Sequence, residues 1–230
     1  MLTSTEYAKK RIANINLNEA TSSETISASP APGNESRETT HYSVVDKNGN
    51  AVSVTTTINL NYGNGHLVKG AGFFLNNEMD DFSSKPGVPN VFGLIGNEAN
   101  AIQPYKRPLS SMTPTIVLKN GKPFIVIGSP GGSTIITTTM QVILNIVDFG
   151  MDIKEAVSST RFHSQWLPDE IMIEPRGLSK DVINNLKAKG HSIVPYKWGY
   201  IGEANGIHII DNRLFYGGGD SRGETSAIGY

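Results

Sequence analysis

The sequence contains no cysteine in its 230 residues. This absence excludes a thiol nucleophile, a disulfide framework and a zinc site built on cysteine ligands. The charge balance excludes another class, because 20 basic and 21 acidic residues leave a formal net charge of −1. Such a chain has no basic excess for neutralising phosphates. We therefore expect neither thiol chemistry nor a nucleic-acid partner.

Long apolar runs are missing as well. No stretch approaches the roughly 18 consecutive apolar residues of a membrane-spanning helix, and residues 1–7 lack the basic and then apolar layout of a signal peptide. The five histidines show no spacing typical of metal ligands, and Glu78, Asp80 and Asp81 lack the glycine and distal glutamate of a calcium loop. The sequence thus predicts no membrane span, no metal site and no cofactor.

The remaining composition is typical of a globular protein, with 38% hydrophobic and 18% charged residues. Residues 4–17 form a moderately amphipathic pattern that predicts a short helix, with Ser4 or Thr5 as its cap. Residues 21–38 are rich in serine, threonine and proline, with Ile26 as the one large apolar side chain. Such a segment cannot nucleate a core, so we expect a flexible linker that divides the chain into residues 1–38 and 39–230.

The second part of the chain has the pattern of an α+β fold. Three pairs of apolar runs flank turn sequences and predict β-hairpins near residues 42–58, 115–127 and 206–216. Helical periodicity predicts helices over residues 134–148 and 179–189, the latter with Ser179 as its cap, and a short helix over 152–159. Residues 59–113 lack periodic runs, and a loop of that length is usually functional.

Three motifs allow more than one interpretation. Residues 128–133, GSPGGS, lie between a strand and a helix, where backbone N–H groups could bind an oxyanion or the chain could simply turn. Residues 76–81, NNEMDD, could hold an ammonium group or form a solvated loop. Residues 219–223 match G-x-S-x-G, but only seven residues follow Gly223. A nucleophile elbow needs a following helix, so we interpret this motif as a glycine-rich turn.

The junction between Glu38 and Thr39 has chemical potential of its own. A polar linker meets a hydrophobic strand there, and such a junction tolerates a proteolytic cut. A threonine exposed by that cut carries both a hydroxyl and an α-amine with a pKa near ~8. The amine can then act as the base for the hydroxyl of the same residue. An ordinary threonine at the start of a strand is the alternative interpretation.

Five segments in order resemble the small subunit of bacterial γ-glutamyltranspeptidase from Thr39 to the end of the chain. They are TTHYSVVDKNGNAVSVTTTIN, GAGFFLNNEMDDFSSKPGVPN, KRPLSSMTPTIVLKNGK, GSPGGSTIITT and RFHSQWLPDE. The resemblance implies the N-terminal nucleophile hydrolase superfamily, with an αββα four-layer sandwich made by a large and a small subunit cut from one precursor. Residues 1–38 would be the C-terminal tail of the large subunit, residues 39–230 the catalytic small subunit, and the sandwich would be partial.

The same resemblance implies a reaction. Thr39 would cleave the bond after Glu38 and then attack the γ-carbonyl of glutathione or another γ-glutamyl compound. Water or an amino-acid or dipeptide acceptor would resolve the acyl-enzyme. Further roles would fall to Thr57, which orients the nucleophile; Asn59, Glu78 and Asp81, which hold the α-amino group of the substrate; Ser110 and Ser111, which contact its α-carboxylate; and Gly131 and Gly132, which form the oxyanion hole.

The resemblance also implies a partner and a location. The partner would be the large subunit of the same precursor, and the enzyme would be periplasmic or secreted. The chain departs from the family pattern in four ways. The arginine that binds the α-carboxylate belongs to the large subunit. Thr134 stands in place of arginine, Ser221 stands in place of proline between Asp220 and Arg222, and residues 199–205 replace a stretch that is usually rich in glycine and serine. Two other hypotheses are an uncleaved, inactive remnant that acts as a binding or interaction domain, and a related acylase with a different acyl group.

Overall fold

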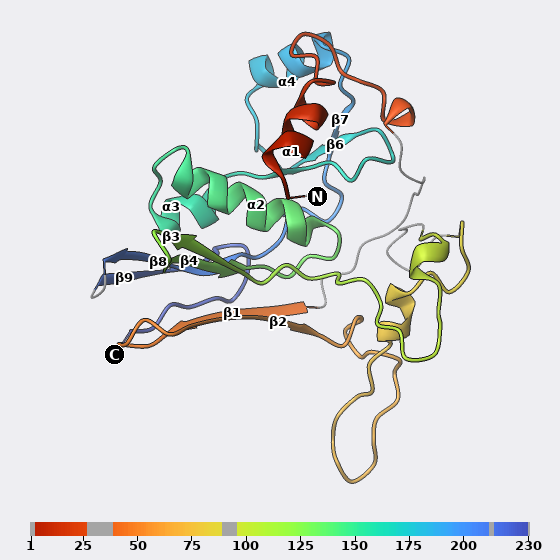
Figure 1. Cartoon of the computed structure of the whole chain (residues 1–230), viewed down its shortest axis with the longest axis vertical. Helices are drawn as coiled ribbons and strands as arrows, with labels where there is room; N and C mark the ends of the chain where they lie inside the picture. Colours follow the sequence, from red (N-terminus) through yellow and green to blue (C-terminus); the bar gives the residue numbers. More distant parts are fainter. Residues whose placement is uncertain (1–2, 27–38, 89–95, 212–213, 230) are drawn as a thin grey trace.

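The fold is a mixed α+β arrangement of stacked layers (Figure 1). The structure is a computed structural model that describes residues 3–26, 39–88, 96–211 and 214–229. Its strands form a two-stranded, a four-stranded and a three-stranded sheet. Within the described ranges, no helix combines the length and the apolar character needed to cross a bilayer.

The first predicted hairpin is confirmed as β1 (Thr39–Val45) and β2 (Ala51–Thr57), paired antiparallel. Its turn forms because Asp46 supplies acceptors for the backbone that follows. The Asp46 carboxylate accepts the N–H groups of Asn48 at 2.8 Å and Asn50 at 2.9 Å. Gly49 takes a φ of +84°, a conformation that suits a residue without a side chain.

The other two predicted hairpins together make the four-stranded sheet. Its order is β3-β4-β8-β9, and all neighbours are antiparallel. These strands are β3 (Thr115–Lys119), β4 (Lys122–Gly128), β8 (Asn205–Asp211) and β9 (Leu214–Gly219). All three predicted hairpins are therefore confirmed.

Strand β4 lies at the centre of the layers and is buried on both faces. Ile125 and Ile127 pack against α2 (Thr134–Val147) and α3 (Ile153–Ser158). Val126 points to the opposite face, where it packs with Val45 of β1. Alternating residues of a strand face opposite sides, which explains why this segment reads as an unbroken apolar run.

Helices α2 and α3, the four-stranded sheet and the β1–β2 hairpin form three successive layers (Figure 1). They correspond to an α, a β and a β layer of the expected αββα sandwich. In the described part of the chain, no helix covers the outer face of the β1–β2 hairpin (Figure 1). The sandwich is thus partial, as the sequence predicted.

A second group of elements adjoins the layers and was not predicted as a sheet. It contains β5 (Phe162–His163), β6 (Ile171–Ile173), β7 (Ile193–Pro195) and α4 (Lys180–Ala188). Strands β6 and β7 are parallel, and strands of two or three residues are too short to show periodicity. Helix α4 was predicted, but Ser179 at its N-cap position makes no side-chain capping bond.

The N-terminal helix α1 (Thr5–Ile12) is shorter than predicted, and Ser4 caps it by accepting the Tyr7 N–H at 3.2 Å. The start of the serine-rich segment is held by long-range contacts. Ser23, in η1 (Ser23–Thr25), donates its hydroxyl to Asp169 at 2.7 Å, and its carbonyl accepts the Trp166 indole N–H at 2.7 Å. Residues 27–38 lie outside the described residues.

Candidate functional site

A cavity of about 490 Å³ opens where β1 begins and β2 ends. It brings together most of the residues that the sequence singled out, although they come from five separate segments. The predicted residues that line it are Thr39, Thr57, Asn59, Asp81, Ser110, Ser111 and Gly132. Glu78, three positions before Asp81, and Gly131, directly before Gly132, do not line the cavity, and Glu38 lies outside the described residues.

Thr39 and Thr57 occupy matching positions on the two strands of the hairpin. Both are partly buried. The Asn59 backbone N–H donates to the Thr57 hydroxyl oxygen at 2.9 Å, which holds the Thr57 side chain in place. Asn59 adopts a φ of +73°, a left-handed conformation that asparagine tolerates better than most residues.

Two asparagines connect the end of β2 to the acidic segment. The buried Asn59 side-chain amide donates to the Asn77 carbonyl at 3.0 Å. In return, the Asn77 side-chain oxygen accepts the Leu60 N–H at 3.2 Å. These bonds hold η2 (Glu78–Asp81) beside the end of the hairpin. Asn77 was visible in the sequence only as one amide of the NNEMDD motif.

The acidic segment places two carboxyl groups close together. Burial raises the pKa of Asp81, and the nearby charge of Asp80 raises it further, while a hydrogen bond from Ser111 opposes this rise. Burial also raises the pKa of Glu78, to which the charge of Asp81 adds. Two crowded, partly buried carboxyl groups favour a positively charged ligand, because a cation offsets both burial and mutual repulsion.

The loop with two serines reaches the same place from another part of the chain. Ser111 donates its hydroxyl to the Asp81 carboxylate at 2.8 Å, whereas Ser110 donates to the Met112 carbonyl at 2.9 Å. Asn100, in η3 (Glu98–Asn100), accepts the Leu109 N–H at 3.0 Å and donates to the Asp81 carbonyl at 2.7 Å. No motif in the sequence signalled this role of Asn100, because it depends on three distant segments.

The glycine loop closes the cavity at the N-terminal end of α2. Gly131 has a φ of +135° and Gly132 a φ of +56°. A Cβ atom on Gly131 would lie 2.5 Å from the Thr134 hydroxyl oxygen and 3.1 Å from the Gly202 Cα. Only glycine fits there, and the positive end of the α2 dipole favours a negative charge at this place. The Thr134 hydroxyl donates to the Gly131 carbonyl at 2.7 Å, so Thr134 stabilises the loop.

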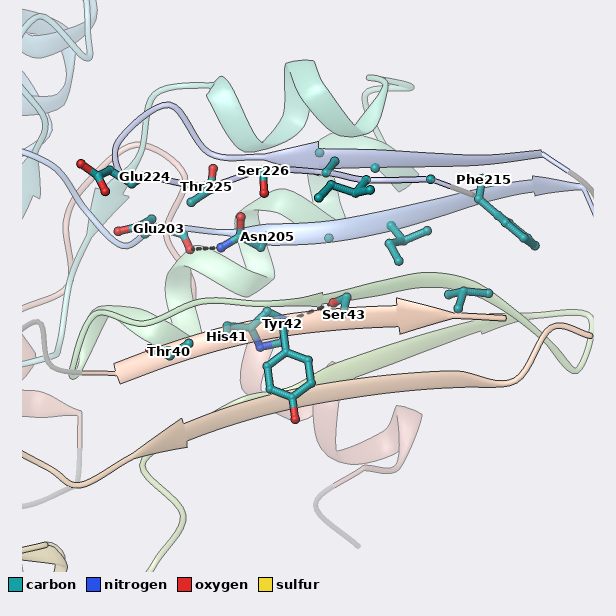
Figure 2. Close-up of a pocket in the computed structure, with 18 of the residues that line it drawn as sticks. Thr40, His41, Tyr42, Ser43, Glu203, Asn205, Phe215, Glu224, Thr225 and Ser226 are labelled. Atoms are coloured by element: carbon teal, nitrogen blue, oxygen red, sulfur yellow. Dashed lines mark hydrogen bonds between the residues drawn. The ribbon is translucent and has the colours of Figure 1, made fainter. Parts of the chain in front are cut away.

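A larger cavity of about 790 Å³ lies between the sheets (Figure 2). Thr40, His41 and Ser43 of β1 lie on one side, and Asn205 and Thr225 lie across from them (Figure 2). Of the site residues that the sequence predicted within the described ranges, it contains Thr39 alone. The smaller cavity is therefore the better candidate for chemistry.

The C-terminal turn supports the fold through buried charges. Arg161 pairs with Asp220 at 2.6 Å, and Arg222 pairs with Asp220 at 3.0 Å and with Glu174 at 2.6 Å. After β9, residues 220–229 form turns and irregular structure. The interpretation of G-x-S-x-G as a turn is thus confirmed, while the ion pairs of its Asp220 and Arg222 had not been predicted.

Comparison with known proteins gives consistent matches over this region. The family model described as gamma-glutamyltranspeptidase matches residues 1–230. The glutathione hydrolase proenzyme of Escherichia coli is 49% identical over 221 residues, which cover 96% of this chain and 38% of that protein. The chain therefore spans about two fifths of this relative.

Two solved structures show the same fold in matched chains. A T380A mutant of the gamma-glutamyltranspeptidase of Helicobacter pylori is 58% identical with a TM-score of 0.76, over 80% of this chain and 100% of that chain. The enzyme of Pseudomonas nitroreducens complexed with L-DON is 46% identical with a TM-score of 0.77, over 83% of this chain and 99% of that chain.

Proposed function

Because the chain belongs to the γ-glutamyltranspeptidase family, we propose that it transfers and hydrolyses γ-glutamyl groups through a covalent intermediate on Thr39. Its donors are glutathione and other γ-glutamyl compounds. The observation that carries the proposal is the single cavity that contains Thr39, Thr57, an acidic side chain, a serine pair and a glycine of the loop before α2. A nucleophile, a cation site and an oxyanion site are what this reaction requires.

The chemistry begins at the hydroxyl of Thr39. After cleavage of the Glu38–Thr39 bond, the α-amine of Thr39 accepts the hydroxyl proton as the oxygen attacks the γ-carbonyl carbon. Gly131 and Gly132 at the start of α2 stabilise the oxyanion, and the proton passes to the leaving amine. Water or an acceptor amine then attacks the ester, and the Thr39 oxygen regains a proton. Thr57, which lies opposite Thr39 in the hairpin, keeps the nucleophile oriented.

The amino-acid end of the donor, which carries its α-amino and α-carboxylate groups, binds in the part of the cavity lined by Asp81, Ser110 and Ser111. Its ammonium group lies against Asp81, with Glu78 and the Asn59 side chain as neighbours. Its carboxylate receives hydrogen bonds from Ser110 and Ser111, together with an arginine of the large subunit that the family resemblance implies. The arrangement is complementary because an ammonium group needs acceptors and a carboxylate needs donors.

Residues 1–38 act as the tail of the large subunit and residues 39–230 as the small subunit. Residues 39–230 make up 192 of the 230 residues. The two relatives of solved structure match 80% and 83% of this chain, and these matches cover 100% and 99% of their own chains. The contacts of Ser23 with Asp169 and Trp166 supply a way for the tail to stay bound after cleavage.

The proposed partner is the remainder of the large subunit. Helix α2 exposes an apolar stripe of Ile136, Met140, Leu144 and Val147, with exposed fractions of 39–58%. Strand β1 pairs only with β2 among the described strands, and a two-stranded sheet is marginally stable by itself. An apolar stripe and an open strand edge both call for a covering chain. The large subunit is that chain, since the sequence spans 38% of its E. coli relative.

The test is co-expression of the chain with a large subunit, followed by mass spectrometry and an assay with γ-glutamyl-p-nitroanilide. We expect a species that begins at Thr39 and release of p-nitroaniline. An intact chain after long incubation would instead support the uncleaved remnant. Cleavage without release of p-nitroaniline, but with turnover of another acyl amide, would support the related acylase. Cell fractionation tests the proposed periplasmic or secreted location.

A further inference from the structure

Residues 163–169 connect the cavity to the N-terminal part of the chain, and none of them has a role in the proposed reaction. Residues 163–165 line the cavity. Trp166 and Asp169, which follow directly, bind Ser23. Ser23 lies 143 positions before Trp166 in the sequence. One short segment therefore contacts both the cavity and the proposed tail of the large subunit.

Ser23 is bonded to this segment through all of its polar groups. Its backbone N–H donates to Asp169 Oδ2 at 2.9 Å, and its hydroxyl donates to Asp169 Oδ1 at 2.7 Å. Its carbonyl accepts the Trp166 indole N–H at 2.7 Å. Ser23 is buried, with 6% exposure. We call these contacts of Ser23 with Trp166 and Asp169 the Ser23 clamp.

Two more hydrogen bonds hold the residues before the clamp. The Ala20 N–H donates to the Lys189 carbonyl at 2.6 Å, and the Lys189 ammonium group donates to the Leu17 carbonyl at 2.8 Å. Lys189 is the C-cap residue of α4. All of these bonds lie well before the Glu38–Thr39 bond in the sequence, so cleavage of that bond leaves them intact.

The Ser23 clamp lies one residue away from a contact with the oxyanion loop, residues 128–133. Gln165 directly precedes Trp166, and its side-chain oxygen accepts the Ser133 hydroxyl at 2.8 Å. Ser133 directly follows Gly132, the glycine of this loop that lines the cavity. Glycine restrains the backbone less than any other residue. The conformation of the loop therefore depends on contacts from outside, such as the one with Gln165.

We infer that the tail stays bound through the Ser23 clamp after cleavage and stabilises the oxyanion loop through Gln165. This inference rests on the proposed function. Trp166 and Asp169 do not line the cavity, so they are positioning residues. Oxyanion donors stabilise the transition state only when they are held in place beforehand. A weaker clamp should therefore lower kcat and leave the donor KM nearly unchanged, because the α-amino and α-carboxylate groups of the donor bind elsewhere.

The first test is Asp169→Ala in the mature heterodimer, with γ-glutamyl-p-nitroanilide as donor. The substitution removes both acceptors of Ser23 and leaves the sequence of the tail unchanged. We expect kcat to fall about fivefold, the scale of one lost hydrogen bond, and the donor KM to stay within twofold. A glutamate-specific protease should cut after the exposed Glu24 about five times faster. Asp148→Ala, at an exposed position outside the cavity, is the control and should change none of these values.

The second test removes the hydroxyl from the other side of the clamp. Ser23→Ala should also lower kcat severalfold. Ser22→Ala is its matched control, because Ser22 is exposed and its side chain makes no capping bond. The Ser23 hydroxyl acts through Asp169, so adding Ser23→Ala to Asp169→Ala should lower kcat no further. A merely structural loss at two independent places would instead add up.

The possible results separate this inference from the proposed function. Faster cutting after Glu24 with unchanged kcat in Asp169→Ala would show that the clamp holds the tail without stabilising the loop. That result would overturn the inference and leave the proposed function standing, as would unchanged cutting with unchanged kcat. No release of p-nitroaniline from the unmodified heterodimer would overturn the proposed function and this inference with it. If Asp169→Ala does not assemble, Trp166→Phe removes the indole N–H and should lower kcat severalfold, with Trp198→Phe as its control.

Discussion

Thr39 and Thr57 face each other as the final register pair of β1 and β2. The pairing carries a chemical consequence, because the residue proposed as nucleophile and the residue proposed to orient it belong to one rigid hairpin. The Thr57 oxygen accepts the Asn59 N–H, and Asn59 in turn bonds to Asn77. These hydrogen bonds connect the acidic segment to Thr57, the register partner of the nucleophile.

Replacement of the nucleophile should abolish both steps of the chemistry. In Thr39→Ala, no hydroxyl remains to attack the Glu38 carbonyl or the donor, so we expect an uncleaved chain and no measurable turnover. Gel electrophoresis and the p-nitroaniline assay measure the two effects. Thr56→Ala is the control, because Thr56 is exposed on the adjacent position of β2. Cleavage that persists in Thr39→Ala would contradict the assignment of the nucleophile.

The hydrogen bond from Ser111 to Asp81 should control the pH dependence of donor binding. Burial raises the pKa of Asp81, and the Ser111 hydrogen bond lowers it. Ser111→Ala removes the opposing effect, so the pKa of Asp81 rises further. Because an ammonium group binds the ionised carboxylate, donor capture is lost as pH falls through this pKa. We therefore expect the acidic limb of kcat/KM to move to higher pH.

The neighbouring serine is the control for that measurement. Ser110 donates to the Met112 carbonyl rather than to Asp81. Ser110→Ala should raise the donor KM without moving the acidic limb along the pH axis. Equal displacement of the limb in both variants would show that Asp81 is not the titrating group.

A side chain at Gly131 should disturb the oxyanion loop for two reasons. The φ angle of Gly131 is unfavourable for other residues, and an added Cβ atom would also collide with its neighbours. In Gly131→Ala, the new Cβ meets the Thr134 hydroxyl oxygen at 2.5 Å and Gly202 at 3.1 Å. We expect kcat to fall about 100-fold, as for the loss of one oxyanion donor. Gly121→Ala is the control, because Gly121 has a φ of +77° with open space around it. That variant should lose about 1 kcal/mol of stability, because an L-residue is disfavoured in the left-handed conformation, and should keep kcat within twofold.

Buried His41 should make the stability of the protein dependent on pH. Burial lowers its pKa from 6.5 to about 4, and its ring bonds to Thr55 at 2.8 Å and to Ser43 at 3.0 Å. The unfolded chain binds a proton near pH 6.5 and the folded chain only near pH 4. The stabilisation is complete above pH 6.5 and is lost as pH falls towards 4, by up to about 3 kcal/mol.

The measurement is the free energy of unfolding of the mature heterodimer in urea at several pH values. His41→Gln should flatten the slope between pH 4 and 6.5, because the titrating ring is gone. His66→Gln, at an exposed position, should leave the slope as it is. A slope that survives in His41→Gln would assign the pH dependence to other groups.

Local patterns in the sequence were sufficient for the elements that support the site. The Asp46–Gly49 turn, the apolar run of β4 and the apolar face of α2 all depend on neighbours within a few residues, and the structure confirms each of them. The glycines before α2 could be singled out for the same reason, since a strand, a flexible turn and a helix follow one another directly.

Tertiary structure alone decided which polar groups meet. Asp81 receives Ser111 from a distant loop, and Arg161 finds Asp220 near the C-terminus. The pairing of β6 with β7 and the hydrogen bond from Ser133 to Gln165 also join segments that lie far apart in the sequence. Such contacts leave no period or spacing in the chain, because their energy comes from desolvated partners brought together only when the layers pack.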